Sequence, residues 1–243
     1  MPYRRLPNTD NARLKAMKKA QEKGKEIPPF KLAFSQSSLY KVTSFLPAFE
    51  KTMLHQKGSF TTQIDRNKDY HSQLKKAKLY ISHFIQVVNM AIQRGELSSS
   101  IRDYYKLNGY GKKLPPLNNE EDVIRWGNTI LEGETQRMRK GLSPITNPTV
   151  AVVKVRYEKF LESYRNQKKL QESTNRALQE LKTIRPRADD IILDIWNEVE
   201  DSFKDLPDNL KREKAAEYGL VYIHRKNEQN NHSMFESSRQ SIS

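Results

Sequence analysis

Cysteine is absent from this chain of 243 residues, and glycine is sparse at nine residues. Without a thiol, the chain has no disulfide scaffold, no cysteine nucleophile and no thiolate metal site. No apolar run approaches the ~20 residues that a membrane-spanning helix needs. The opening residues 1–7 have two arginines but no apolar stretch behind them, which is unlike a secretory signal. These absences predict a cytoplasmic protein without a membrane partner.

Positive charge is abundant, with 43 Lys and Arg against 29 Asp and Glu and a net charge of +14. The excess lies in three blocks of +6 each, residues 1–34, 67–117 and 149–187, whereas residues 188–223 carry four cations and ten carboxylates. A uniformly basic protein would strongly suggest nucleic-acid binding. An internal acidic block can neutralise part of the positive field, so an acidic protein surface is the first expected partner and nucleic acid the second.

Apolar residues recur at helical spacing over residues 39–53 and 70–92, which predicts two amphipathic helices. Between them, Gly58 and Ser59 resemble a helix breaker and Asp65 a helix N-cap. Two long helices joined by about ten residues are expected to fold back as an antiparallel hairpin.

The second half of the chain repeats this pattern at an offset of about 111 residues, over 150–164 and 181–203. Short helices follow both copies, at 98–109 and 208–219, the second with Gly219 as its C-terminal glycine. Between the copies, Asn118 and the acidic residues after it begin another helix that ends near Gly141. A common offset for both helices indicates a structural repeat.

The predicted fold class is therefore all-α, a bundle of four long helices from two tandem hairpins joined by a crossover helix. The expected segments are a basic N-terminal arm with one helix (1–34), the first hairpin unit (35–109), a linker with the crossover helix (110–148), the second hairpin unit (149–223) and a disordered tail (224–243). The residues expected to pack together at the centre of the bundle are Val42, Leu46, Phe49, Ile81, Phe84, Val88, Val153, Tyr157, Phe160, Ile192, Ile195 and Val199. Pro47 and Pro186 are expected to kink or restart their helices.

Both ends of the chain show a family resemblance. The opening Pro2–Asp10, and the stretch from Ala188 through Ile195-Trp196-Asn197 to Tyr218–Tyr222, resemble uncharacterised helical proteins of Bacteroidota-type bacteria. The resemblance brings no activity and assigns no functional residue.

Candidate contact residues fall in two places. The basic arm cannot bury much of its own surface, and after the first hairpin three tyrosines alternate with cations. Both patterns suit an acidic protein partner or, alternatively, single-stranded nucleic acid; the tyrosines could instead close the apolar end of the hairpin. The candidate partner-binding residues are Arg4, Arg5, Arg13, Lys15, Lys18, Lys19, Arg102, Tyr104, Tyr105, Tyr110, Lys112 and Lys113.

Catalytic and metal-binding patterns are weak. Asp190, Asp194 and Glu198 form a carboxylate ridge that could hold a cation, although a solvated face or a partner for the basic helices 67–94 and 149–169 is favoured. No histidine has the neighbours of a helical metal site, and no nucleophile motif is present. The leading hypothesis is a non-catalytic scaffold or protein-interaction module without a cofactor, the alternative is sequence-independent nucleic-acid binding, and an enzyme comes third.

Overall fold

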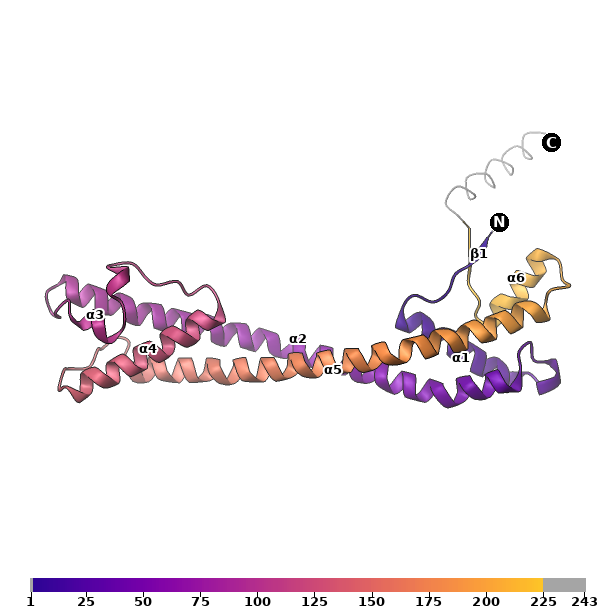
Figure 1. The fold of residues 1–243 in the computed structure, drawn as a ribbon, viewed down its shortest axis with the longest axis horizontal. Helices are drawn as coiled ribbons and strands as arrows, with labels where there is room; N and C mark the ends of the chain where they lie inside the picture. The colour runs from indigo at the N-terminus through magenta and orange to yellow at the C-terminus, as the bar shows by residue number, and fades with distance from the viewer. Residues whose placement is uncertain (1, 225–243) are drawn as a thin grey trace, which may run out of the picture. The chain divides into compact units, whose positions relative to one another are not determined.

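The computed structural model describes residues 2–224; Met1 and residues 225–243 lie outside it. The described chain is almost entirely helical, which confirms the all-α fold class (Figure 1). Its α-helices are α1 (Asp10–Glu26), α2 (Gln36–Gln93), α3 (Ile101–Tyr104), α4 (Glu120–Arg139), α5 (Val150–Ser202) and α6 (Asp208–Glu217). Two 3₁₀ turns, η1 (Pro29–Lys31) and η2 (Asn108–Tyr110), and two short strands, β1 (Tyr3–Arg4) and β2 (Tyr222–Ile223), complete the described chain.

The chain divides into two compact units. Of the described residues, 2–58 and 175–224 form unit 1 and 59–174 form unit 2. Helices α2 and α5 each contribute one part to unit 1 and the other part to unit 2. These units differ from the expected segments, since each combines residues from both predicted hairpins.

The hairpin prediction is wrong because α2 is a single helix of 58 residues, with Gly58, Ser59 and Asp65 in its interior. A helix-interior glycine costs only about 1 kcal/mol relative to alanine, which favourable packing can offset. Helix α5 supplies that packing in unit 2, where the Thr174 hydroxyl donates to the Ser59 carbonyl oxygen and the Gln167 side chain donates to Asn67. These pairs run antiparallel, so the unit 2 parts of α2 and α5 lie side by side in opposite directions.

The bundle of four long helices is also wrong, because α5 is a single helix of 53 residues. Residues 165–175 of α5 contain no glycine or proline, so nothing in the sequence stops the helix where the second turn was expected. Pro47 and Pro186 do not restart their helices and are exposed. Helix α4 forms between Asn119, whose side chain accepts from the Asp122 amide, and Gly141 at φ +74°. Instead of returning the chain in its original direction, α4 precedes an α5 whose unit 2 part runs antiparallel to that of α2.

All twelve predicted core residues are buried, but they form two cores and not one centre. In unit 1 the core contains Val42, Leu46, Phe49, Ile192, Ile195 and Val199 together with residues of α1 and α6. In unit 2 it contains Ile81, Phe84, Val88, Val153, Tyr157 and Phe160 together with residues of α4. The apparent repeat therefore comes from the two long helices α2 and α5. Each of them has one apolar stripe in the core of unit 1 and another in the core of unit 2.

The N-terminal arm is part of unit 1. Helix α1 begins after Thr9, whose hydroxyl accepts from the Ala12 amide, and it buries Ala16, Met17 and Ala20 in the unit 1 core. Strand β1 pairs antiparallel with β2 near the other end of the described chain, with Tyr3 opposite Ile223. The helical pattern did not predict these strands. Of the expected tail, only His224 lies within the described residues.

Within residues 2–224, no helix is long and apolar enough to cross a membrane.

Candidate basic-rimmed pocket

Three of the arm cations are paired with carboxylates of unit 1. The Arg13 guanidinium donates to both carboxylate oxygens of Asp189, at 2.7 and 3.0 Å. Arg4 donates to Glu200 at 2.8 Å, and Lys18 lies 2.6 Å from Glu50. These carboxylates neutralise cations that the sequence assigned to a partner.

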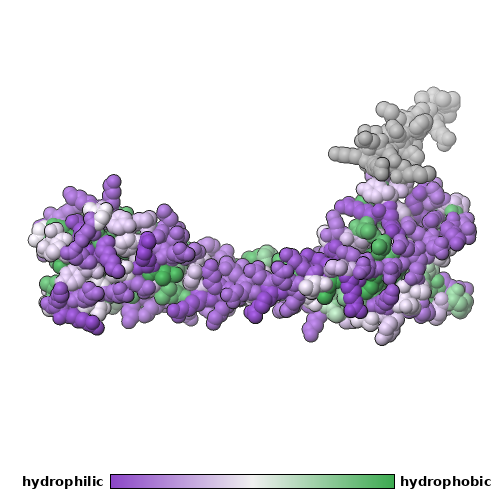
Figure 2. Space-filling view, viewed as in Figure 1, coloured by the Kyte–Doolittle hydropathy of each residue, from purple (hydrophilic) through white to green (hydrophobic). Residues whose placement is uncertain are grey.

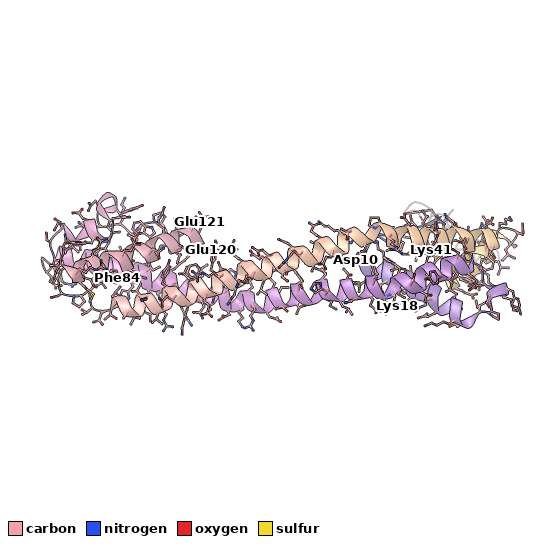
Figure 3. The ribbon with its side chains drawn as sticks, turned by 60° about the horizontal axis from the view of Figure 1, so that its bottom comes forward. Asp10, Lys18, Lys41, Phe84, Glu120 and Glu121 are labelled. Carbon is pink, nitrogen blue, oxygen red and sulfur yellow. The ribbon has the colours of Figure 1, made fainter. Side chains whose placement is uncertain are left out.

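A second bidentate arginine–carboxylate pair joins α1 to α5, close to the Arg13–Asp189 pair. Arg185 of α5 donates to both oxygens of Asp10 at 2.8 and 2.7 Å. Asp10 is labelled in Figure 3. Arg13 is also 3.4 Å from Asp10, so the four charges of Asp10, Arg13, Arg185 and Asp189 form one network. Paired fork geometry fixes the direction of both side chains, so the network sets how α1 lies on α5.

The carboxylate ridge has partners other than the expected ones. Asp194 lies 3.0 Å from Lys41 at the start of α2, and Glu198 accepts from the Ser35 amide and the Ser38 hydroxyl. The ridge therefore pairs with the N-terminal part of unit 1, and these contacts involve neither 67–94 nor 149–169. No group of three or more His, Cys, Asp or Glu side chains in the described chain is placed to hold a metal ion.

Unit 1 contains a pocket of about 460 Å³ between the N-terminal segment, α1 and the chain after α6. Its wall includes Leu6 and Pro7, and the Trp196 side chain of α5 also lines it. Leu220 and Val221 also line it, directly after Gly219, which ends α6 at φ +93°. Hydrophobic atoms show at the surface of unit 1 beside the N-terminal segment in Figure 2.

The pocket is lined by three of the candidate cations, Arg5, Lys15 and Lys19. Lys15 and Lys19 are one turn apart on α1, so they share one side of the helix. Among residues 2–224, Lys19 is 3.6 Å from Glu22, and no carboxylate forms an ion pair with Arg5 or Lys15. The six candidate cations of the arm thus divide into three that pair with carboxylates of unit 1 and three that line an apolar pocket.

The candidate tyrosines are packed into unit 2 and do not form an exposed platform. Tyr105 is fully buried, and Tyr110 lies edge-on against Trp126 with ring centroids 5.5 Å apart. Tyr104 is half-buried, with Lys140 5.1 Å from its ring centroid. The interpretation that the tyrosines close an apolar end is the better description, because their rings pack against α2 and α4.

The remaining candidates lie near these tyrosines. Arg102 donates to Asn89 at 3.3 Å, whereas Lys112 and Lys113 are exposed in the turn after η2. Neither lysine forms an ion pair with a carboxylate of the described residues. They lie in unit 2 and do not belong to the pocket of unit 1.

A buried polar network explains why Tyr105 is inside. Its hydroxyl donates to Glu134, which also accepts from Arg137 at 2.8 Å and from the Ile145 amide at 2.7 Å. Arg137 donates in addition to the Ser143 carbonyl oxygen at 2.8 Å. Glu134 and Arg137 are at most 1% exposed, so the pair holds the segment after α4 onto unit 2.

Sequence reasoning missed the apolar part of the pocket. Trp196 was noted only for the family resemblance, and residues 220–223 were not assigned a structure. The run Leu220-Val221-Tyr222-Ile223 is rich in strand-forming residues and directly follows a helix-ending glycine, which is a usable signal for β2.

The chain matches no family model, no curated protein and no solved structure. The Bacteroidota-type resemblance of its two ends stays a prediction.

Proposed function

We propose that this protein is a non-catalytic interaction module and that the pocket of unit 1 binds an acidic segment of a partner protein. The observation that carries the proposal is the convergence of Arg5, Lys15 and Lys19 on an apolar pocket. The other candidate cations of the arm, Arg4, Arg13 and Lys18, have carboxylate partners in unit 1. Three cations around an apolar pocket complement a carboxylate next to a large apolar side chain.

The size and wall of the pocket support this assignment. Binding pockets generally measure about 300–1,000 Å³ and combine apolar walls with a few polar groups that orient the ligand. A volume of about 460 Å³ accepts a large side chain with its neighbours. The cations would steer an acidic partner toward the pocket and make the binding sensitive to salt.

The packing of the tyrosines favours a protein partner over nucleic acid. Proteins that bind single strands generally stack bases on exposed aromatic rings along a basic groove. Tyr105 is buried, and Tyr104 and Tyr110 are partly covered by their own unit. The sequence-based alternative of nucleic-acid binding therefore loses one of its two supports.

Fluorescence anisotropy with a labelled 12-residue peptide tests the proposal. The peptide has a central Phe-Leu pair flanked by Asp and Glu, and a second peptide replaces each acid by its amide. We expect only the acidic peptide to bind. The double variant Lys15→Glu/Lys19→Glu should weaken binding at least tenfold, which corresponds to about 1.4 kcal/mol.

The matched control is Lys112→Glu/Lys113→Glu, which makes the same change in net charge on exposed lysines of unit 2. Equal weakening by both double variants would refute the pocket as the site. A labelled single-stranded 20-mer DNA at about 50 mM salt tests the alternative, because phosphate contacts are strongest at low salt. Tight DNA binding with no binding of the acidic peptide would overturn the proposal.

A further inference from the structure

A second surface, in unit 2, combines an apolar groove with cations that have no carboxylate partner among residues 2–224. The groove measures about 440 Å³ and lies between α2 and the start of α5. Leu79, Tyr80 and His83 line it from α2, and Pro148 and Val152 line it from the α5 side. None of these residues belongs to the pocket of unit 1.

The groove, together with the turn of α5 that follows it, leaves aliphatic side chains in contact with solvent. Leu79 is 61% exposed, and Val152 and Val155 are 40% and 49% exposed. Leu79 stands between Ala77 and Ile81, which are fully buried, so at 100° per residue it points away from the unit 2 core. Val152 and Val155 are three residues apart and share one face of α5. Apolar side chains gathered on one surface mark an interaction site more often than single exposed ones do.

The charges beside the groove are mostly positive. Lys76 precedes Leu79 by about one turn of α2, and Lys159 follows Val155 by one turn of α5. Neither lysine forms an ion pair with a carboxylate among the residues described. The Arg156 guanidinium lies 5.4 Å from the ring centroid of Tyr80. Glu158 is the one acid on this stretch of α5, and it is 3.8 Å from Lys154.

We infer that this groove is a docking site for an amphipathic helix of a partner protein, with apolar residues at i, i+3 and i+4 and acidic residues beside them. A helix of this kind covers an apolar groove with one face and can place carboxylates opposite flanking cations. A second copy of the chain is the less suitable occupant. A two-fold symmetric contact would bring Lys76 and Lys159 of both copies to one interface, where like charges repel.

The inference does not depend on the pocket of unit 1. If both sites bind, the protein connects two acidic partners, which is the property of a scaffold.

The probe for the test is an acetylated 18-residue helical peptide with leucines at i, i+3, i+4 and i+7 and glutamates between them. Its affinity for the full-length protein is measured by fluorescence anisotropy. Leu79→Ser/Val152→Ser should weaken binding at least tenfold because it removes the apolar contact. Lys76→Glu/Lys159→Glu should weaken it at least threefold and reduce its dependence on salt.

The matched control is Leu54→Ser, since Leu54 is 59% exposed on the unit 1 part of α2. Far-ultraviolet circular dichroism confirms that each variant keeps its helix content. Equal affinity of wild type, Leu79→Ser/Val152→Ser and Leu54→Ser would overturn the inference. So would wild-type dimerisation in sedimentation velocity that Leu79→Ser/Val152→Ser abolishes, because the occupant would then be a second copy.

Discussion

Gly58 lies in the interior of α2, where an added Cβ would meet nothing within 4 Å. Alanine is the better helix former by about 1 kcal/mol, because glycine loses more backbone entropy in a helix. We therefore expect Gly58→Ala to raise the free energy of unfolding by about 0.5–1 kcal/mol in urea denaturation. If residue 58 instead lay in a turn with positive φ, Gly58→Ala would lower the free energy of unfolding.

Gly133 provides the matched comparison in α4. An added Cβ there would clash with the backbone oxygen of Tyr104 and with the ring of Tyr105, so α3 can approach α4 only at a glycine. Overpacking of this kind typically costs about 1–3 kcal/mol. Gly133→Ala should lower the free energy of unfolding by that amount in the same urea assay, and an unchanged or raised stability would contradict the close contact.

The Tyr105–Glu134–Arg137 network predicts a dependence of stability on pH. Burial first, and then the hydrogen bond to Glu134, raises the pKa of Tyr105 above its usual value of about 10. A raised folded-state pKa stabilises the fold below the unfolded pKa, and this contribution is lost as the pH rises toward the folded-state pKa. Stability should therefore fall above about pH 10.

Tyr105→Phe should reduce that alkaline slope, and thermal unfolding between pH 8 and 11 measures it. Some slope should remain because burial raises the pKa values of Tyr70 and Tyr222 in the same direction. At neutral pH, Arg137→Ala should cost about 3–5 kcal/mol, because it leaves the Glu134 carboxylate buried without its cation. The same alkaline slope of stability in wild type and in Tyr105→Phe would exclude a role of Tyr105 in this pH dependence.

At the scale of single elements, the two bidentate arginine–carboxylate pairs between α1 and α5 lead to a testable prediction. Arg13 and Asp189 form two hydrogen bonds, and the Arg13 side chain is 12% exposed. A double-mutant cycle with Arg13→Ala and Asp189→Ala should give a coupling energy of about 1 kcal/mol, within the range for contacting charged pairs. Arg5→Ala with Asp189→Ala is the control pair, and its coupling should be near zero. A similar coupling energy for both pairs would show that the Arg13–Asp189 pair does not hold α1 on α5.

The sequence was sufficient for the helices that have clear starts and stops. Asn119, beside the predicted Asn118, caps α4, and Gly219 ends α6 as its pattern predicts. The apolar stripes also identified the core residues correctly, since all twelve are buried. These features depend on local chemistry, which a sequence displays directly.

The arrangement of the helices could not be predicted in the same way. Whether Gly58 ends a helix depends on packing that can offset about 1 kcal/mol, and that packing comes from α5, more than 100 residues away. The contacts of the arm cations could not be predicted either, because Arg13 and Lys15 stand in the same basic run and have similar sequence neighbours. Only the fold shows that Arg13 meets Asp189 and that Lys15 lines a pocket.

At the scale of the whole molecule, the last prediction follows from the two separate cores. Phe49 packs in the core of unit 1 and Phe160 in the core of unit 2, and both are fully buried. Replacing either by alanine should cost about 3–5 kcal/mol, the range for a large side chain lost from a core. Hydrogen exchange followed by mass spectrometry resolves where the protection is lost.

The expected loss is local to each unit. Phe49→Ala should speed exchange in α1 and α6 and leave α4 protected, whereas Phe160→Ala should speed exchange in α4 and leave α1 protected. The reason is that, among the described residues, the core residues of α1 and α6 belong to the unit 1 core and those of α4 belong to the unit 2 core. The single bundle centre expected from the sequence would instead make both substitutions loosen the same helices. An identical exchange pattern in the two variants would therefore argue that the chain unfolds as one cooperative unit in spite of its two cores.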